Sequence, residues 1–273
     1  TASGREIRSE TKFFWKILLH LLATPFTLLQ VLFRKKPSSE LFRPFHELLL
    51  FIFEPKFTIL IILANIGLYI WSLFQPLEVL QGLINVPSNL LDLKLHTLIT
   101  SGFLHASIAH LLGNMLALFI FGRVVERKLG TIKTAIVYFG ALILSNLFYS
   151  IIHLFILGDN TGGLGASGAI MGLASAAMLL DPLYITYELI VPLPVMVVAW
   201  LMIYADLTGI LNPVEDGIGH FAHLGGFLSI GLLTFLLDIE DRKNLKRGVI
   251  INLLSVAVAA GLVLFFGMPI LPI

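Results

Sequence analysis

The sequence predicts an all-α polytopic membrane protein. Of its 273 residues, 57% are hydrophobic and only 13% are charged, and the mean hydropathy is +0.93. A soluble domain of this length does not have such a composition, and the strand-length alternation of an outer-membrane barrel is missing from the sequence. The net charge of +1 gives no support for nucleic-acid binding. The absence of cysteine excludes disulfides, thiolate catalysis and cysteine-based metal sites. We expect the lipid bilayer as a partner, and no nucleic acid, no metal and no cofactor.

The first 45 residues form a basic and amphipathic segment. An apolar run at 13–33 is broken by Lys16, His20 and Pro25, and basic residues flank it on both sides. Positive charge on both flanks favours a helix that lies on the cytosolic face of the membrane. A true crossing by residues 11–33 is the alternative.

Seven further apolar segments follow, each close to the ~20 residues that a bilayer requires. They are 57–75, 103–122, 132–153, 165–180, 185–208, 219–237 and 248–267. If residue 56 is cytosolic, all of the 18 lysines and arginines except Lys94 fall on the cytosolic side. We therefore predict a plasma-membrane protein with a cytosolic N-terminus and an external C-terminus.

The loop after the first segment and the prolines of the fifth segment lead to two further predictions. The first external loop, about 76–95, is so apolar that we expect it to lie in the outer leaflet. Pro192 and Pro194 fall near the middle of the fifth segment and predict a kinked helix there.

Polar side chains at membrane depth mark functional sites because they are expensive to place there. They gather in three of the segments: His105, His110 and Asn114 in the second, Ser167 in the fourth, and His220 and His223 in the sixth. Three of them lie 14 or 15 residues from the charged residue that ends their segment: Asn114 from Lys128, Ser167 from Asp181, and His223 from Asp238. At a rise of 1.5 Å per residue these three share a depth of roughly 21–22 Å. We therefore expect them to meet at one level.

The run Gly162–Gly172 is rich in glycine and carries Ser167 at the start of an apolar helix. A serine hydroxyl becomes a nucleophile when a neutral histidine takes its proton, and His223 can serve as that base. The resulting oxyanion needs donors, which the Ser167 backbone N–H, the Asn114 amide and the His110 ring can supply. His110 and Asn114 are spaced i, i+4 and so share one helix face.

Small residues allow the serine and histidine helices to approach closely. They are Gly168, Gly172 and Ala176 on one helix, and Ala222, Gly225 and Gly226 on the other. Helix packing alone would also explain such residues. The polar groups at one shared level favour a hydrolytic site instead.

Here the sequence resembles the rhomboid intramembrane serine proteases from about Phe57 to Asp238. Gly165-Ala166-Ser167-Gly168 resembles the family's GxSG, His110-x-x-x-Asn114 its HxxxN, and Ala222-His223-x-x-Gly226 its AHxxG; Gly122, Arg123, Glu126 and Gly130 resemble the turn after its second span. The family's Trp-Arg pair in the first external loop is missing, so the anchoring of that loop is not carried over.

The resemblance implies a six-helix catalytic core at 46–240, preceded by the basic segment 1–45 and followed by a seventh span at 241–273. It implies cleavage of transmembrane-helix protein substrates, with Ser167 as nucleophile, His223 as base, and His110 and Asn114 as oxyanion donors. Met171 takes a position where some members place an aromatic residue under the catalytic ring. Gly165, Gly168 and Gly226 would shape the site.

Four other polar residues receive structural interpretations. His105 is expected to form a structural hydrogen bond, and His220 to face water or to support the site. His153 is expected at the membrane interface. Asp206, near the outer end of the fifth segment, is interpreted as a capping or loop-tethering residue. Because no acidic residue is evident beside His223, the sequence favours a Ser-His dyad over a triad.

Three rival functional classes remain for this sequence. A metalloprotease would need HExxH, but leucines follow His46-Glu47. A histidine-based metal transporter would hold its histidines near the membrane midplane rather than near the outer surface. A non-catalytic rhomboid-like binding protein is the main alternative, although such relatives characteristically lack the serine or the histidine that are both present here.

Overall fold

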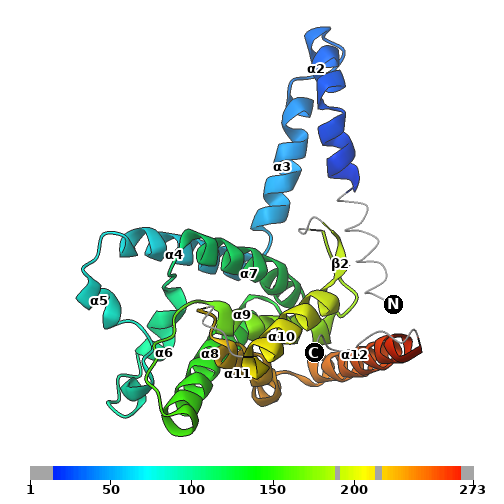
Figure 1. Cartoon of the computed structure of the whole chain (residues 1–273). Helices are drawn as coiled ribbons and strands as arrows, with labels where there is room; N and C mark the ends of the chain where they lie inside the picture. Colours follow the sequence, from blue (N-terminus) through cyan, green and yellow to red (C-terminus); the bar gives the residue numbers. More distant parts are fainter. Residues whose placement is uncertain (1–14, 188–190, 213–216, 266–273) are drawn as a thin grey trace.

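The computed structural model describes residues 15–187, 191–212 and 217–265. This part of the chain is almost entirely helical, which confirms the predicted all-α class (Figure 1). The elements up to the end of α8 are helix Trp15–Leu22, α2 (Thr24–Leu32), α3 (Ser39–Phe53), α4 (Lys56–Ser72), α5 (Leu77–Gln81), η1 (Pro87–Leu90), α6 (Thr97–Thr100), η2 (Ser101–Phe103), α7 (Ile108–Leu129) and α8 (Thr131–Ile151). Then follow the π-helical turn η3 (Ile152–Leu157), α9 (Ser167–Leu180), β1 (Ile185–Thr186), β2 (Leu193–Pro194), α10 (Val195–Leu211), α11 (His220–Leu233), η4 (Thr234–Leu236) and α12 (Ile239–Phe265).

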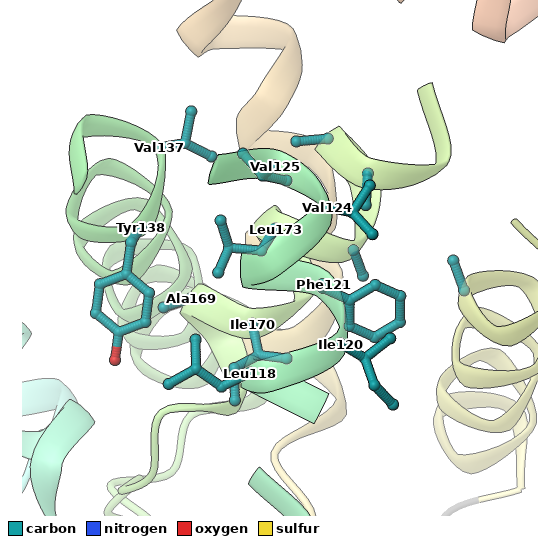
Figure 2. Close-up of a cluster of buried hydrophobic side chains, with 14 of the residues drawn as sticks. Leu118, Ile120, Phe121, Val124, Val125, Val137, Tyr138, Ala169, Ile170 and Leu173 are labelled. Carbon is teal, nitrogen blue, oxygen red and sulfur yellow. The ribbon is translucent and has the colours of Figure 1, made fainter. Parts of the chain in front are cut away.

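Helix α9 is the centre of the bundle, and α7, α8, α10, α11 and α12 all pack against it. Its sequence consists of small and apolar residues around the whole circumference, so it can be surrounded without burying a charge. Every residue from Gly168 to Met178 is buried. Figure 2 shows Ala169, Ile170 and Leu173 of α9 among the buried side chains of α7 and α8. The residue that begins α9, Ser167, is thus held by the most constrained element of the fold.

Among the described residues, two helices have the length and composition of a membrane span, and the seven predicted crossings stay a prediction. Ile108–Leu129 and Thr131–Leu157 are long and apolar enough to cross a membrane. Two bent pairs of helices pass this test when each pair is taken together, as a broken span or a re-entrant loop would, and α9, α10 and α11 are shorter apolar helices. At 14 residues, α9 and α11 are about 21 Å long, which is less than the ~30 Å hydrocarbon core. A helix this short can begin inside the membrane.

The second predicted span, 103–122, differs from the helix that forms. Residues Ser101–Phe103 make a 3₁₀ turn, and α7 begins only at Ile108. The Ser107 hydroxyl accepts a hydrogen bond from the His110 backbone N–H at 3.1 Å, so this serine is the N-cap of α7. His105 therefore precedes the helix, and its phase relative to His110 cannot be obtained from helical spacing.

The fifth predicted span, 185–208, also differs from the helix that forms, which is α10 at Val195–Leu211. The predicted proline kink is wrong. Thr186 and Leu193 pair in a short antiparallel ladder, and α10 begins only at Val195, directly after Pro194. A proline before the first helical residue needs no N–H partner and fits there without strain. Both prolines thus mark the start of the helix and leave its interior unbroken.

The N-terminal helices project away from the bundle (Figure 1). Helices α3 and α4 meet at 87°, so α3 lies nearly perpendicular to a helix that would cross the membrane. Helix Trp15–Leu22 and α2 meet at 52°, and Lys16 contacts Glu47 of α3 at 2.8 Å. If α4 crosses the membrane upright, a helix at this angle to it would lie along the membrane surface. Whether residues 11–33 span the membrane or lie on it stays open, and residues 11–14 lie outside the described part.

The loop at 76–95 is tied to the bundle by its own contacts, in place of the missing Trp-Arg pair. Asn85 forms a backbone bridge with Gly163, with hydrogen bonds of 2.8 and 3.2 Å. The buried Asn85 side chain donates to the Ser150 hydroxyl of α8 at 3.1 Å. The backbone N–H of Ser88 donates to Asn160 at 2.8 Å. The loop is thus fastened to the segment that leads into Ser167.

The Glu126 carboxylate, near the C-terminal end of α7, caps the N-terminus of α4. It accepts from the backbone N–H groups of Phe57 and Thr58 at 2.9 and 3.0 Å, and from the hydroxyls of Thr58 and Thr131 at 2.9 Å each. The first N–H groups of a helix lack partners within the helix, and a carboxylate there also meets the positive end of the helix dipole. This buried residue therefore holds α4 against α7.

Replacing Glu126 with alanine is expected to destabilise the fold by about 2–4 kcal/mol, because the buried N–H groups of α4 lose a charged acceptor. Thermal unfolding of the purified protein in detergent would measure the loss. Glu78→Ala, at an exposed position of α5, is the matched control and is expected to change little. Equal stability of the two variants would contradict the capping role.

The ends of the helices opposite Ser167 are joined by ion pairs. Lys128 of α7 contacts Asp181 at 3.0 Å, and Lys133 of α8 contacts Asp238 at 2.7 Å. The pKa of the exposed Asp238 carboxyl is lowered to about 2 because it accepts the Asp241 backbone N–H and pairs with Lys133. The contact between Lys128 and Asp181 confirms that α7 and α9 end at one level, as the depth count assumed.

Helix α12 docks on the same end of α9. The amide of Asn252 donates to the Met178 carbonyl at 2.8 Å and accepts from the Trp200 indole of α10 at 2.9 Å. Gly248 lies against the backbone of Leu179, with no space for a side chain between them. The last helix is therefore packed against the core in this structure, and its predicted crossing at 248–267 ends at residues outside the described part.

Candidate active site

Three helix N-termini converge where the sequence predicted a shared level of polar groups. His110 is the third residue of α7, Ser167 is the first of α9, and His223 is the fourth of α11. All three of these helices therefore begin at the Ser167 end of the bundle. An N-terminus carries a partial positive charge and backbone N–H groups without partners in the helix. This end of the fold favours a developing negative charge.

The turn before Ser167 fits only a glycine at position 165. Gly165 has a φ of +121°, which side-chain-bearing residues rarely adopt. A Cβ on Gly165 would lie 2.8 Å from both Cε1 and Nε2 of His110, and 3.6 Å from Nδ2 of Asn114. The Gly165 N–H is fixed by the Ser101 carbonyl at 2.9 Å. The turn is therefore pressed against the two predicted oxyanion donors.

Ser167 stands at the first position of α9, after Ala166. The backbone N–H of a first helical residue has no intrahelical acceptor, so it is available to a bound oxyanion. Ala166 and Gly168 are buried, whereas Ser167 is partly exposed. The serine thus faces an accessible space from a rigid helix end.

Close contact between α9 and α11 brings the histidine helix to the serine, as the small residues predicted. A Cβ on Gly226 would lie 2.8 Å from the carbonyl carbon of Gly168 and would overlap its oxygen. A Cβ on Gly168 would lie 2.7 Å from the Ser145 Cβ and 3.5 Å from the Ala222 carbonyl oxygen. Ala222 directly precedes His223, and Gly168 directly follows Ser167. The two helix backbones therefore touch at the residues adjoining the candidate nucleophile and base.

Asn114 and His105 form a pair, as expected for a structural histidine. The Asn114 Nδ2 donates to the His105 Nε2 at 3.0 Å, and both side chains are buried. This bond occupies one of the two amide hydrogens of Asn114 and fixes the plane of the amide. The predicted oxyanion role of Asn114 would use its second amide hydrogen. The rings of His105 and His110 also meet edge to face at 5.0 Å between centroids.

The expectation that no acidic residue lies beside His223 was wrong. An oxygen of Asp206, Oδ1, lies 2.7 Å from the His223 Nδ1 and 2.8 Å from the His220 Nδ1. Asp206 lies inside α10, five residues before its end, and is buried, so it caps neither a helix nor a loop. His220 and His223 thus share one carboxylate oxygen, and a supporting role for His220 stays a prediction. The sequence did contain a signal for this pairing, because Asp206 falls inside an apolar segment, and a carboxylate buried in a membrane helix needs a partner.

The structure also places Met171 and His153. Met171 is buried in α9, four residues after Ser167, and its predicted place under the catalytic ring stays a prediction. His153, in the π-helical turn η3 that follows α8, contacts Asp159 in the next loop at 2.7 Å. The pKa of the Asp159 carboxyl is lowered mainly by this hydrogen bond from His153, and further by the Thr161 backbone N–H. This second Asp-His pair lies in the loop that leads to the glycine-rich turn.

The arrangement contains the parts that acyl transfer needs: a serine hydroxyl, a histidine one helix away, and donors aimed at the same end of the bundle. The catalytic roles of these residues stay predictions. The ligand atoms of Asp206, His220 and His223 also lie within 4.8 Å of one another, as metal ligands would.

Comparison with known proteins identifies the family of the chain. The Rhomboid domain family model matches residues 92–241, which is more than half of the chain and includes every candidate site residue. The match begins in the loop before α6 and ends in α12.

The similar proteins come from bacteria and plants. The chain is 30% identical over 230 residues to the rhomboid protease AarA of Providencia stuartii, covering 75% of this chain and 79% of that protein. It is 29% identical over 181 residues to RHOMBOID-like protein 12, mitochondrial, of Arabidopsis thaliana, covering 61% of this chain and 54% of the relative. It is 32% identical over 145 residues to the putative rhomboid protease YdcA of Bacillus subtilis, covering 51% and 65%. The chain thus spans about half the length of the first of the plant relatives. The family match and the similarity to AarA together show that this chain belongs to the rhomboid family.

Proposed function

We propose that this chain is an intramembrane serine endopeptidase that hydrolyses peptide bonds in or near transmembrane segments of other membrane proteins. Its family includes a bacterial rhomboid protease, AarA. The observation that carries the proposal is the position of Ser167, partly exposed at the N-terminus of a buried helix, next to the contact of Gly168 with Ala222 and Gly226.

In the proposed reaction, the Ser167 hydroxyl attacks the scissile carbonyl carbon while His223 Nε2 takes the hydroxyl proton. The tetrahedral oxyanion is stabilised by the Ser167 N–H, the free Asn114 N–H and the His110 ring. His223 then gives the proton to the leaving amine, and the acyl-enzyme remains. His223 then takes a proton from a water, which attacks the acyl carbon. The bond to Ser167 Oγ breaks, His223 returns the proton to Oγ, and the second product leaves with a new carboxyl group.

The position of the site fits a substrate that arrives from the membrane. A helix of 14 residues is too short to cross the bilayer core, so a spanning bundle around α9 would hold Ser167 below the surface. Water then reaches the serine from one side of the membrane and a transmembrane segment from within it. We propose that this side is external, with a cytosolic N-terminus, because the positive charges of the chain follow that topology.

A fluorophosphonate that phosphonylates activated serines tests the proposal. The purified wild-type protein is expected to be labelled, whereas Ser167→Ala is not. Ser175→Ala, at a buried serine two turns further along α9, is the matched control and should be labelled like wild type. Labelling that survives Ser167→Ala contradicts the assignment.

A folded wild-type protein that takes no label and cleaves no transmembrane substrate would favour the alternative, a rhomboid-like protein that binds transmembrane clients without cutting them. Binding of a single-pass transmembrane peptide by both wild type and Ser167→Ala would then be the measurement that supports it.

A further inference from the structure

We infer that Asp206 is a third functional member of this site, which holds the His223 ring in the tautomer that a general base requires. This inference rests on the proposed function. It goes beyond that function because neither the sequence analysis nor the proposed reaction gives an acidic residue a part in the chemistry.

The first step concerns the proton on His223. An ionised carboxylate can only accept hydrogen bonds, so at 2.7 Å from Asp206 the His223 Nδ1 must be the donor. A neutral imidazole carries one ring proton, and placing it on Nδ1 leaves Nε2 with a lone pair. That lone pair is what removes the proton from a serine hydroxyl. The carboxylate thus selects the productive tautomer and stabilises the imidazolium that forms.

The second step concerns how the carboxylate is held. Asp206 lies in α10, which packs against both α9 and α11, and its side chain is only 9% exposed. Gly209 follows it by one helical turn, and a Cβ there would lie 2.7 Å from Cδ2 of His220. A pair on α10, Asp206 and Gly209, therefore matches a pair on α11, His220 and His223, each at i, i+3 spacing. The missing side chain of Gly209 admits the His220 ring.

The third step concerns His220. Its Nδ1 lies 2.8 Å from the same Asp206 oxygen, and its ring is nearly perpendicular to that of His223 at 6.4 Å between centroids. The carboxylate oxygen is thus fixed from two sides, so it cannot turn away from His223. His220 positions Asp206, and Asp206 positions His223.

Direct hydrogen bonds describe this cluster better than a metal ion between its members. Zinc bonds to nitrogen and oxygen of about 2.0–2.2 Å in a tetrahedral site place neighbouring ligand atoms roughly 3.4 Å apart. The nitrogen–oxygen separations here are 2.7 and 2.8 Å. We therefore assign the protons, and not a cation, to the space between these atoms.

Asp206→Asn is the central variant, because an asparagine keeps the shape while losing the charge, and its amide can donate to Nδ1. We expect its fluorophosphonate labelling rate, and its kcat on a transmembrane substrate, to fall by about 10²–10⁴-fold with little change in KM, by analogy with the loss of the aspartate in soluble serine proteases. Asp159→Asn is the matched control, because Asp159 pairs with His153 at the same 2.7 Å outside the site. It is expected to stay within twofold of wild type.

A spectroscopic measurement separates positioning from folding. In protein with ¹⁵N-labelled histidine, the His223 signals, identified by their loss in His223→Ala, are expected to report a protonated Nδ1 and an unprotonated Nε2 in wild type. Asp206→Asn should shift them toward the other tautomer. A wild-type His223 with its proton on Nε2 would overturn the inference even if every Asp206 variant failed to fold.

The outcomes for the two proposals are distinct. If Asp206→Asn reacts at the wild-type rate while Ser167→Ala and His223→Ala are inactive, the role of Asp206 is wrong and the proposed function stands. If Ser167→Ala still reacts, the proposed function itself fails. A wild-type rate that changes on adding EDTA, or zinc that copurifies in equal amount with the protein, would show a metal in the cluster and overturn the hydrogen-bond assignment.

Discussion

The double variant Ser167→Ala/His223→Ala is expected to lose no more cleavage activity than either single variant. Each single change should reduce kcat by at least about 10⁴-fold, because a nucleophile without its base, or a base without its nucleophile, performs no covalent step. In soluble serine proteases the members of such a unit are strongly non-additive for this reason. Cleavage of a transmembrane substrate in proteoliposomes, compared across the four proteins, gives the measurement.

Two controls make the comparison decisive. His46→Ala removes a histidine of α3, which belongs to the N-terminal helices that project from the bundle, and should cleave like wild type (Figure 1). The thermal unfolding midpoints of the four proteins should agree within a few degrees, because Ser167 and His223 are only partly buried. Additive losses, in which the double variant falls well below both single variants, would mean that the two residues act independently.

The sequence could predict the all-α class and the approach of the serine and histidine helices because both depend on residues close together in the chain. Apolar runs, the Gly165 turn and the glycine faces at Gly168 and Gly226 are local patterns with direct physical consequences. The structure confirms the close approach of α9 to α11 at the glycines that predicted it. Membership of the rhomboid family, inferred from three short motifs, is confirmed by the family match over residues 92–241.

The errors arose where a contact joins segments that no local pattern relates. Asp206 was interpreted as a capping or loop-tethering residue, because its partner lies 17 residues away on the next helix and no local pattern relates the two. Counting the depth of Asp206 from the end of α10 would have placed it near the level of His223. The start of α10 was missed because apolar residues continue through the strand Leu193–Pro194, and hydropathy does not distinguish a short apolar strand from a helix.

The contact of His105 with Asn114 also could not be predicted from the sequence, although the two residues are only nine positions apart. The distance of His105 from Asn114 in sequence could not give a contact, because the chain between them leaves helical geometry at the cap residue Ser107. A serine before an apolar run is a recognised helix start, so this boundary could have been located from the sequence. The hydrogen bond from Asn114 to His105 that follows from it could not.

Gly226→Ala is expected to lower kcat by about 10²-fold. The substitution adds only one methyl group and changes neither the charge nor the length of α11. The new Cβ would meet the Gly168 carbonyl, which is backbone and cannot move aside alone, so α11 must shift away from α9. A displacement of His223 by about 1 Å from Ser167 is enough for a loss of this size. Overpacking of this kind also costs about 1–3 kcal/mol of stability.

Gly231→Ala, in the same helix, is the matched control, and its expected change in stability has the opposite sign. A Cβ at Gly231 meets nothing within 4 Å. Alanine there should stabilise α11 by about 0.5–1 kcal/mol, because glycine is unfavourable inside a helix, and should leave cleavage within twofold of wild type. Cleavage and unfolding of the two variants, measured side by side, separate helix propensity from helix approach. If Gly226→Ala is as active as Gly231→Ala, the contact between α9 and α11 does not set the distance between Ser167 and His223.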